Sequence, residues 1–286
     1  MKDLLIALSS NFTYEHLKPW IESFNEVNTE AERALLLFNA DADTVHKVVE
    51  KGFRIFSPVN RQDDNSFIYG SPIHMNVERF GHFWNFLRET RSEYRYILAC
   101  DSRDMVFQSD PFQYLHDFFS KNPDKNFIAS AEPILYKDEI FWGAQNFIQS
   151  FGVAAFDSVK DRMIYNAGTI AGRADYVIDL FCTIFFMSLN NRVANPDQAA
   201  YNFLLSLEPY KSMTHFASSG EPWAAQIGVL THPQFDPYRQ EPKPLWINDA
   251  LYTNNGEKYS ILHQYDRAPE ILPFINQKFG VNINEH

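Results

Sequence analysis

Asp101 and Asp104 follow directly on an apolar stretch, in the segment YILACDSRDMVFQSDPF at residues 96–112. Two carboxylates this close repel each other, so the arrangement is costly unless a cation or an arginine lies between them. A hard divalent ion such as Mg²⁺ or Mn²⁺ prefers oxygen ligands, and it takes one or two carboxylates together with substrate phosphate oxygens. Alternatively, Arg103 pairs with one of the aspartates at the surface, and the SDP sequence at 109–111 begins the next helix. The segment by itself is compatible with a metal site and with a surface ion-pair cluster.

The elements that would position these aspartates are predicted from hydrophobic periodicity. In the first half of the chain, short apolar runs alternate with stretches of helical spacing, which is typical of βαβ units and a mostly parallel sheet. Ligands bind beyond the carboxyl ends of the strands in such sheets, so Asp101 and Asp104 are expected at the ligand-binding edge. We predict strands at 4–10, 33–40, 53–58 and 94–100, and helices near 14–26, near 43–50 and, after a polar stretch at 60–67, from 73 to 87.

The second half of the chain is less regular. We predict a strand at 127–133, helices at 175–189 and 197–207, and a strand at 259–267 that runs into a loop. The aromatic-rich stretch 138–165 has no clear assignment. With no linker or internal repeat visible, we predict one α/β domain over residues 1–286, with a Rossmann-like, mostly parallel sheet flanked by helices and an irregular C-terminal part.

Charge and apolar runs exclude several classes of protein. The net charge is −11 and no Lys/Arg cluster is visible, which argues against binding of nucleic acid or of an anionic membrane surface. The apolar run before Ser9 is short and follows Asp3, so we expect a first strand rather than a signal peptide. The apolar stretch 177–189 is too short to span a bilayer. Cys100 and Cys182 are expected to be reduced thiols, which favours a cytoplasmic protein.

Four stretches, in this order, resemble the GT-A-fold glycosyltransferases. The strand that ends in DSRD at 101–104 is similar to the DxD-like motif that holds a divalent cation and the diphosphate of a nucleotide sugar. The stretch YNAGTIAG at 165–172 resembles the segment that lines the donor-sugar and acceptor site. The stretch NPDQAAYN at 195–202 resembles the Asp-Gln segment of retaining, glycogenin- and galactosyltransferase-like members, and ILHQYDR at 261–267 resembles the late histidine-bearing strand. Here Arg103 stands where the DxD motif has its second aspartate.

The resemblance implies an enzyme that moves a hexose or pentose from a nucleoside diphosphate sugar, UDP-sugar favoured, to a hydroxyl of a glycan or other acceptor. It implies a nucleotide-binding half at about 1–125, an acceptor-binding half at about 126–286, and Mn²⁺ or Mg²⁺ as cofactor. The implied metal ligands are Asp101, Asp104 and His263, and the implied catalytic residues are Asp197 and Gln198. The implied substrate contacts are Ser9, Asn11, Arg79, Asp101, Arg103, Asn166, Ala167, Gly168, Trp223 and Arg267.

Each of these positions also has a structural interpretation. His263 could be a satisfied core histidine, and Asp197 could be the first-turn acid of the helix at 197–207. Asn166 and Gly168 could form an ordinary turn. Other aromatic residues that could stack on sugar rings, although core packing is the commoner role, are Trp142, Phe147 and Trp246.

The reaction itself has alternatives. Retaining chemistry is favoured by the Asp-Gln segment, whereas inverting chemistry would need Asp157, Asp197 or Asp236 as general base. If Arg103 abolishes turnover, the protein would be a catalytically silent one that binds a nucleotide sugar without transferring it. A phosphoryl-transfer hydrolase is disfavoured because the chain has no GxxxxGK[ST] motif. His215 and His232 are expected to be structural.

Overall fold

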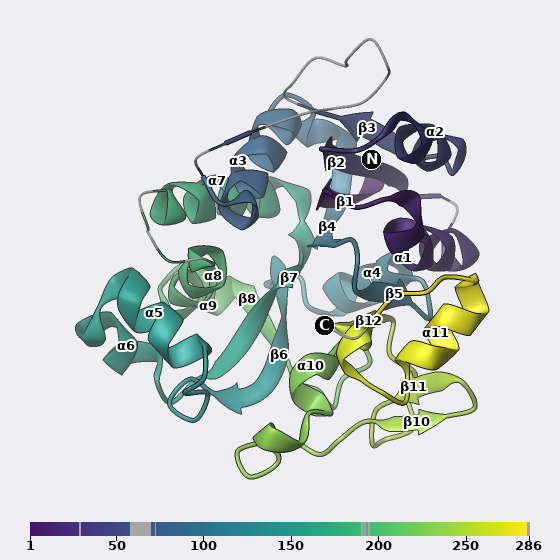
Figure 1. The fold of residues 1–286 in the computed structure, drawn as a ribbon. Helices are drawn as coiled ribbons and strands as arrows, with labels where there is room; N and C mark the ends of the chain where they lie inside the picture. Colours follow the sequence, from purple (N-terminus) through teal and green to yellow (C-terminus); the bar gives the residue numbers. More distant parts are fainter. Residues whose placement is uncertain are drawn as a thin grey trace.

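The computed structural model describes residues 1–284 apart from 29, 58–69, 72, 190, 192 and 194. The polar stretch predicted at 60–67 lies outside the described residues. Within them, a central sheet is flanked by helices on both faces (Figure 1). Among the described helices, none is both long and apolar enough to span a bilayer. Both cysteines, Cys100 and Cys182, are free.

The central sheet has seven strands in the described residues, in the order β3-β2-β1-β4-β7-β6-β8. Every neighbouring pair is parallel except the two pairs that involve β7, which runs against both β4 and β6. The predicted mostly parallel sheet is therefore confirmed, with β7 as its antiparallel strand. The strands are β1 (Lys2–Ser10), β2 (Glu32–Phe38), β3 (Arg54–Phe56), β4 (Tyr94–Asp101), β6 (Phe127–Leu135), β7 (Met163–Arg173) and β8 (Thr214–Ala217).

Six of the described helices cover the central sheet in two layers. The described helices as a whole are α1 (Tyr14–Val27), α2 (Ala42–Glu50), α3 (Met75–Leu87), α4 (Pro111–Lys121), α5 (Gly143–Phe151), α6 (Val153–Val159), α7 (Ala174–Ser188), α8 (Pro196–Ser206), α9 (Tyr210–Met213), α10 (Ile227–Leu230) and α11 (Leu272–Phe279). Helices α1, α2 and α4 pack on one face of the sheet, and α3, α7 and α8 pack on the other. The predicted helices begin and end within a few residues of the observed ones.

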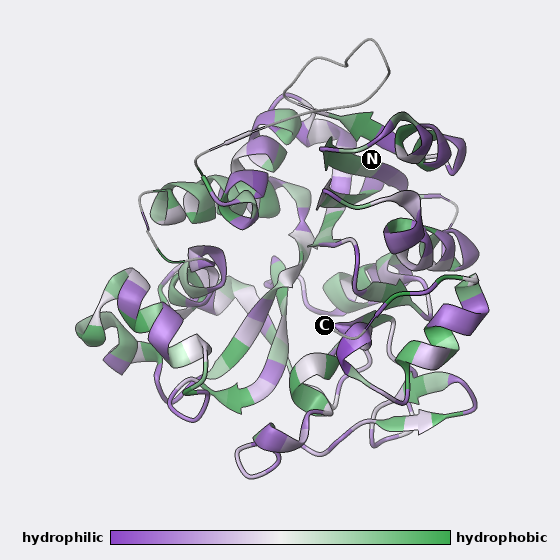
Figure 2. Ribbon diagram, in the orientation of Figure 1, coloured by the Kyte–Doolittle hydropathy of each residue, from purple (hydrophilic) through white to green (hydrophobic). Residues whose placement is uncertain are grey.

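Alternation along the strands produces these two layers. In β1, Leu5 and Ala7 enter the core under α1, whereas Leu4 and Ile6 enter the core under α3 and α7. Successive side chains of a strand point to opposite faces, so a strand covered on both faces must be apolar throughout. Figure 2 shows the resulting hydrophobic central strands beside the more hydrophilic outer turns of α1 and α2.

Local capping sets the start of α4, which follows the two aspartates. The side chain of Asp110 accepts hydrogen bonds from the backbone N–H groups of Phe112 and Gln113, at 2.8 and 3.3 Å. Pro111 occupies the first turn, where its missing N–H costs nothing. The SDP sequence therefore begins a helix, as predicted. This helix start does not involve Asp101 or Asp104.

The C-terminal part carries a second, three-stranded sheet of order β5-β12-β9. Strands β5 (Met105–Phe107) and β12 (Ile261–His263) are antiparallel, and β9 (Ala224–Gln226) runs parallel to β12. The strand predicted at 259–267 is thus shorter, because the 3₁₀ turn Tyr265–Arg267 ends it. A hairpin of β10 (Leu245–Ile247) and β11 (Ala250–Tyr252) lies beyond it. The unassigned stretch 138–165 contains α5, α6 and the start of β7.

Candidate metal centre and adjoining cavities

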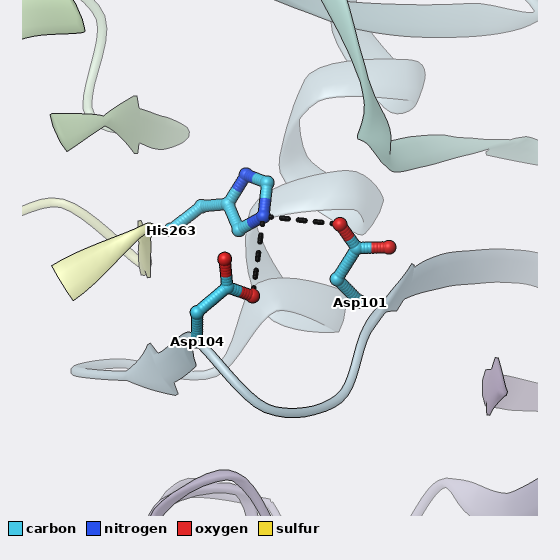
Figure 3. A group of neighbouring side chains, drawn as sticks. All are labelled: Asp101, Asp104 and His263. Carbon is cyan, nitrogen blue, oxygen red and sulfur yellow. Dashed lines mark ion pairs between the residues drawn. The ribbon is translucent and has the colours of Figure 1, made fainter. Parts of the chain in front are cut away.

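Asp101, Asp104 and His263 form a group that we call the Asp-Asp-His cluster (Figure 3). The His263 Nε2 atom lies 3.3 Å from Asp101 Oδ2 and 3.5 Å from Asp104 Oδ1. One ligand atom from each residue lies within 4.8 Å of the others, which is near enough to hold a metal ion. The three-stranded sheet brings the three residues together. Its strand β12 pairs with β5 so that His263 lies opposite Met105, and Met105 directly follows Asp104 in the sequence.

The ring of His263 is oriented from behind by Gln226. Its Nδ1–H donates to the Gln226 side-chain oxygen at 2.7 Å, and the Gln226 amide donates to Thr169 Oγ1 at 3.0 Å. The ring nitrogen that faces the two carboxylates is therefore Nε2, which is buried and has no hydrogen-bond partner in the described structure. A ligating histidine in metal sites is held in this way, with the second nitrogen bonded to an oxygen acceptor.

The charged groups of the cluster shift one another's pKa values. Burial alone would lower the pKa of His263, but the carboxylates of Asp104 and Asp101 raise it to about 10. Burial opposes ionisation of Asp104, yet His263 keeps the pKa of that carboxyl below its usual range. A proton on the imidazole thus balances the two acids. A divalent cation would supply the same balance, and two carboxylates with an imidazole suit such an ion.

Gly168 leaves room for the cluster at the middle of β7. A Cβ atom at this position would lie 2.5 Å from His263 Cε1 and 2.6 Å from Asp101 Oδ2. Both distances are shorter than non-bonded atoms allow, so only glycine fits here without moving a ligand. The sequence prediction placed this glycine beside a sugar. The structure places it beside the Asp-Asp-His cluster, on the wall of the smaller cavity.

Arg79, on α3, connects the cluster to the start of α8. Its guanidinium donates to Asp101, and also to Asp197 Oδ2 at 3.1 Å. Burial lowers the pKa of Arg79, but these two carboxylates more than reverse the effect. The pKa of Asp197 is raised by burial, against the attraction of Arg79. Arg79, which was predicted to contact the donor, is thus already engaged by two acids.

Arg103 has a different partner from the one the sequence suggested. It pairs with Asp266, a fully buried carboxylate in the 3₁₀ turn after β12. The Tyr265 hydroxyl also donates to the backbone oxygen of Arg103 at 3.1 Å. The expected pairing with Asp101 or Asp104 is absent from the described ion pairs. The arginine in the DSRD motif instead fastens the loop after β4 to the segment that follows His263.

Two cavities meet at the cluster. The larger, of about 1070 Å³, lies beyond the carboxyl ends of β1 and β4; its described lining is Leu8, Ser10, Asn11, Phe12, Asn39, Gly70, Ser71, Ile73, His74, Met75, Asn76, Arg79, Asp101, Ser102, Arg103, Asp104, Asn191, Val193 and Arg267. The smaller, of about 350 Å³, is lined by Asn76, Arg79, Asp101, Glu132, Glu139, Trp142, Asn166, Ala167, Gly168, Asn195, Asp197, Gln198, Gly228, Val229, Phe235, His263, Gln264 and Arg267. Four residues line both cavities: Asn76, Arg79, Asp101 and Arg267.

Most of the predicted site residues lie on these walls. The smaller cavity takes Asn166, Ala167, Gly168, Asp197 and Gln198, and the larger takes Asn11, Arg103 and Asp104. Among the other aromatic candidates, Trp142 lines the smaller cavity, Phe147 is buried in the core and Trp246 packs on Phe274. His215 pairs with Glu221, and the His232 side chain caps a short 3₁₀ turn.

Two predicted substrate contacts are corrected by the structure. Trp223 has no exposed surface and packs in the core against Tyr114, with ring centroids 5.1 Å apart. Ser9 is buried on the side of β1 away from the larger cavity, and its neighbour Ser10 lines that cavity instead. Strand alternation explains the second correction, since adjacent residues point to opposite faces.

Sequence reasoning missed several polar residues of the site, among them Glu132, Gln226 and Gln264. Glu132 projects from β6 into the smaller cavity, where it accepts hydrogen bonds from Asn166 and Gln198. Gln226 orients His263, and Gln264 lines the smaller cavity beside Arg267. Glu132 interrupts an apolar strand, and that interruption was the one available signal. Nothing in the local sequence marked Gln226.

The arrangement can bind a cation between the larger and the smaller cavity. Arg267 is exposed, lines both cavities and makes no ion pair with a described residue, so its charge is available to an anionic ligand. A phosphate group beside a carboxylate-bound cation and an arginine would be doubly neutralised. Comparison of the chain with protein-family models and with curated proteins finds no match.

Proposed function

We propose that this protein is a glycosyltransferase of GT-A-like fold, which moves a sugar from a nucleoside diphosphate sugar to a hydroxyl of a glycan or other acceptor. A UDP-sugar is the favoured donor, and Mn²⁺ or Mg²⁺ the favoured cofactor. The observation that carries the proposal is the position of the Asp-Asp-His cluster between the two cavities. Asp101 lines both, so a diphosphate held there would have its nucleoside on one side and its sugar on the other.

The larger cavity supports the nucleotide part of the proposal. It lies where the strand order β3-β2-β1 turns back to β4, and this topological switch point is where open parallel sheets bind nucleotides. Ser10, Asn11 and Asn39 line it and offer hydroxyl and amide groups to a base or ribose. This cavity adjoins β1 and β4, which belong to the half at about 1–125 that the resemblance to GT-A-fold enzymes assigns to nucleotide binding.

The smaller cavity supports the sugar part. Its volume of about 350 Å³ is at the lower end of the range for small-molecule sites. Its polar lining includes Asn166, Gln198 and Glu132, which are held by hydrogen bonds to one another. Trp142, at its wall, is partly exposed and could stack on the apolar face of a sugar ring.

In the proposed reaction, the bond between the anomeric carbon and the β-phosphate oxygen breaks, and its electron pair leaves with the nucleoside diphosphate. The acceptor hydroxyl oxygen forms the new bond, and its proton passes to the departing phosphate or to a carboxylate. The Asp-Asp-His cluster would hold a divalent cation, which would offset the negative charge that builds on the diphosphate. Arg267 would add a second positive charge from the wall that the two cavities share.

We assign the role at the reacting centre to Asp197 in either stereochemical course, because it lines the smaller cavity. In a retaining reaction, Asp197 and Gln198 would stabilise the positively charged sugar ring. In an inverting reaction, Asp197 is the best-placed base, because Asp157 and Asp236 form exposed ion pairs and line neither cavity. Retaining chemistry remains favoured by the Asp-Gln segment. Analysis of the product anomer by NMR decides between the two.

A catalytically silent nucleotide-sugar-binding protein is the second candidate, and the Arg103–Asp266 pair is the observation that favours it. Arg103 replaces a usual metal carboxylate and is engaged elsewhere. Under this alternative, nucleotide sugars bind but are neither hydrolysed nor transferred. Under the main proposal, Mn²⁺ produces turnover with a suitable acceptor, or slow hydrolysis of the donor without one.

A thermal-shift screen against UDP-, GDP- and CMP-sugars, with and without Mn²⁺, tests the proposal. A ligand that binds only the native state raises the unfolding temperature, so we expect a shift with a UDP-sugar that grows when Mn²⁺ is added. Asp104→Ala should remove the Mn²⁺-dependent part of the shift, whereas Asp157→Ala, at an exposed ion pair, should keep it. Absence of a shift with every nucleotide sugar would contradict the proposal. An unchanged Mn²⁺ effect in Asp104→Ala would remove the metal role.

A further inference from the structure

The smaller cavity contains a buried carboxylate with one oxygen left over. Glu132 lies in β6 and is 7 % exposed. The side-chain amide of Asn166 donates to its Oε1 atom at 2.5 Å, and that of Gln198 donates to the same atom at 3.4 Å. No described residue donates to Oε2. The two amides therefore fix the orientation of the carboxylate and leave a second acceptor atom for a ligand.

The other unassigned carboxylate of this cavity is already satisfied. Glu139 accepts hydrogen bonds from the backbone N–H groups of Trp142 and Gly143, at the start of α5. Its role is explained by capping that helix. Asp101 and Asp197 are engaged by Arg79. Asp197 Oδ1 also has no hydrogen-bond partner, but Arg79 neutralises that carboxylate through Oδ2. Among the described carboxylates of the cavity, Glu132 is thus the one that has both an unused oxygen and no ion pair.

The charge of the cavity wall is unfavourable to an anion. Among the described residues, four carboxylates line it, those of Asp101, Glu132, Glu139 and Asp197, against the guanidinium groups of Arg79 and Arg267 and the imidazole of His263, which faces Asp101 and Asp104. Arg79 is committed to Asp101 and Asp197, and Arg267 also faces the larger cavity. Burial raises the pKa of Glu132, with the hydrogen bond from Asn166 acting against it, so a further anion nearby would be repelled or would force protonation. Hydroxyl groups, in contrast, can donate to Oε2 at no charge cost.

We propose that Glu132 accepts a hydrogen bond from a hydroxyl of the transferred sugar, and that the smaller cavity selects an uncharged hexose or pentose over a uronic or sialic acid. This inference rests on the proposed function and narrows its substrate class. Glu132 is a specificity-determining residue in this scheme. A site built to pair with a sugar hydroxyl discriminates strongly against a ligand that leaves the buried group unpaired or opposes its charge.

Titration calorimetry of the full chain in Mn²⁺, with UDP, UDP-glucose, UDP-galactose and UDP-glucuronate as ligands, tests the inference. We expect at least one uncharged UDP-sugar to bind more than about tenfold more tightly than UDP-glucuronate. In Glu132→Gln, an NH₂ group takes the place of the Oε2 acceptor. This variant should lose most of that preference, while its affinity for UDP alone should stay unchanged because UDP occupies the larger cavity.

Glu139→Gln is the matched control, because it removes a carboxylate of the same cavity that is bonded to backbone. It removes one negative charge of the cavity but no unused acceptor atom, so it should lose less of the preference than Glu132→Gln does, even if its unfolding temperature falls. Equal affinity of the wild type for uncharged and uronic UDP-sugars would overturn the inference, as would equal weakening of UDP and UDP-glucose in Glu132→Gln. Failure of UDP and all UDP-sugars to bind would instead overturn the proposed function, and the inference with it.

Discussion

The larger and the smaller cavity lie on either side of Asp101, but they are built differently. The larger is bordered by loop residues after strands, including Asn11 and Asn39, which have φ values of 63° and 48°. Asparagine tolerates this left-handed conformation better than most residues. The smaller is lined in part by β6, β7 and α8, where Asn166 and Gln198 both donate hydrogen bonds to Glu132.

This difference teaches where selectivity should reside. Side chains on strands and helices, fixed by mutual hydrogen bonds, hold a geometry more closely than loop residues do. We therefore expect the smaller cavity to discriminate between chemical groups and the larger to contribute affinity. Substitutions in the wall between the cavities, at Arg79 or next to the Asp-Asp-His cluster, should disturb both.

Arg79→Met should have the largest effect, because Arg79 lines both cavities and neutralises two carboxylates. Removing one partner of a buried ion pair typically costs about 3–5 kcal/mol. Urea unfolding should show a loss of that size, and neither UDP nor a UDP-sugar should bind with its original affinity. Arg91→Met removes an exposed pair with Asp179 and should change stability by no more than about 0.5 kcal/mol. If Arg91→Met lost stability and Arg79→Met did not, the bridging role of Arg79 would be refuted.

Gln226→Leu tests whether the cluster between the cavities is a metal site. Loss of the acceptor for His263 Nδ1 frees the ring, and changes of this kind typically cost about 10–100-fold in metal affinity. Mn²⁺ titration followed by electron paramagnetic resonance measures the change. Gln108→Leu is the control, because Gln108 is bonded to the backbone of Leu251 and Tyr259 instead. Equal Mn²⁺ affinities of the wild type and Gln226→Leu would count against the metal assignment.

The free energy of unfolding should depend on pH differently in the wild type and in Glu132→Gln, because burial raises the pKa of Glu132. The pKa of Glu132 is raised above its ordinary value of 4.5, so the folded state holds the proton more tightly than the unfolded state does. The stability due to the protonated group is complete below about 4.5 and is lost as pH rises through the folded pKa. Each unit of pKa difference corresponds to about 1.4 kcal/mol.

Denaturant unfolding between pH 4 and pH 8 measures this, and the wild type should lose stability relative to Glu132→Gln as pH rises. Asp161→Asn is a control of opposite sign, because the Lys137 side chain lowers the pKa of Asp161 by hydrogen bonding. A pH-independent difference between wild type and Glu132→Gln would show that Glu132 is not the strained carboxylate of the smaller cavity.

Trp223→Phe should have the smallest effect on ligand binding. Trp223 belongs to the core and lines neither cavity, so the substitution should cost about 1–2 kcal/mol of stability and leave the affinity for a UDP-sugar unchanged. Trp142→Phe, at the wall of the smaller cavity, is its counterpart and should weaken sugar binding without a comparable loss of stability. If Trp223→Phe weakened sugar binding and Trp142→Phe did not, Trp223 would belong to the binding site and Trp142 would not.

Sequence alone determined the elements that depend on local pattern. The alternation of apolar runs with helical spacing predicted β1 to β4 and α1 to α3, and the apolar run before Asp101 placed the two aspartates at the edge of a sheet. Composition and periodicity are local signals, and they report burial within a strand or a helix. They did not reveal β7 as an antiparallel strand, or the short strands of the second sheet, because strand direction and pairing depend on distant partners.

Tertiary structure decided which side chains meet. Asp266 as the partner of Arg103, Gln226 behind His263, and Glu132 facing the smaller cavity are contacts between segments far apart in the chain. Tertiary packing also decided the role of Trp223, since an aromatic residue in an apolar stretch of sequence fits a core and a ligand wall equally well. Residue type states what chemistry a side chain can perform, whereas burial and neighbours, which only packing defines, decide whether it performs that chemistry or supports the fold.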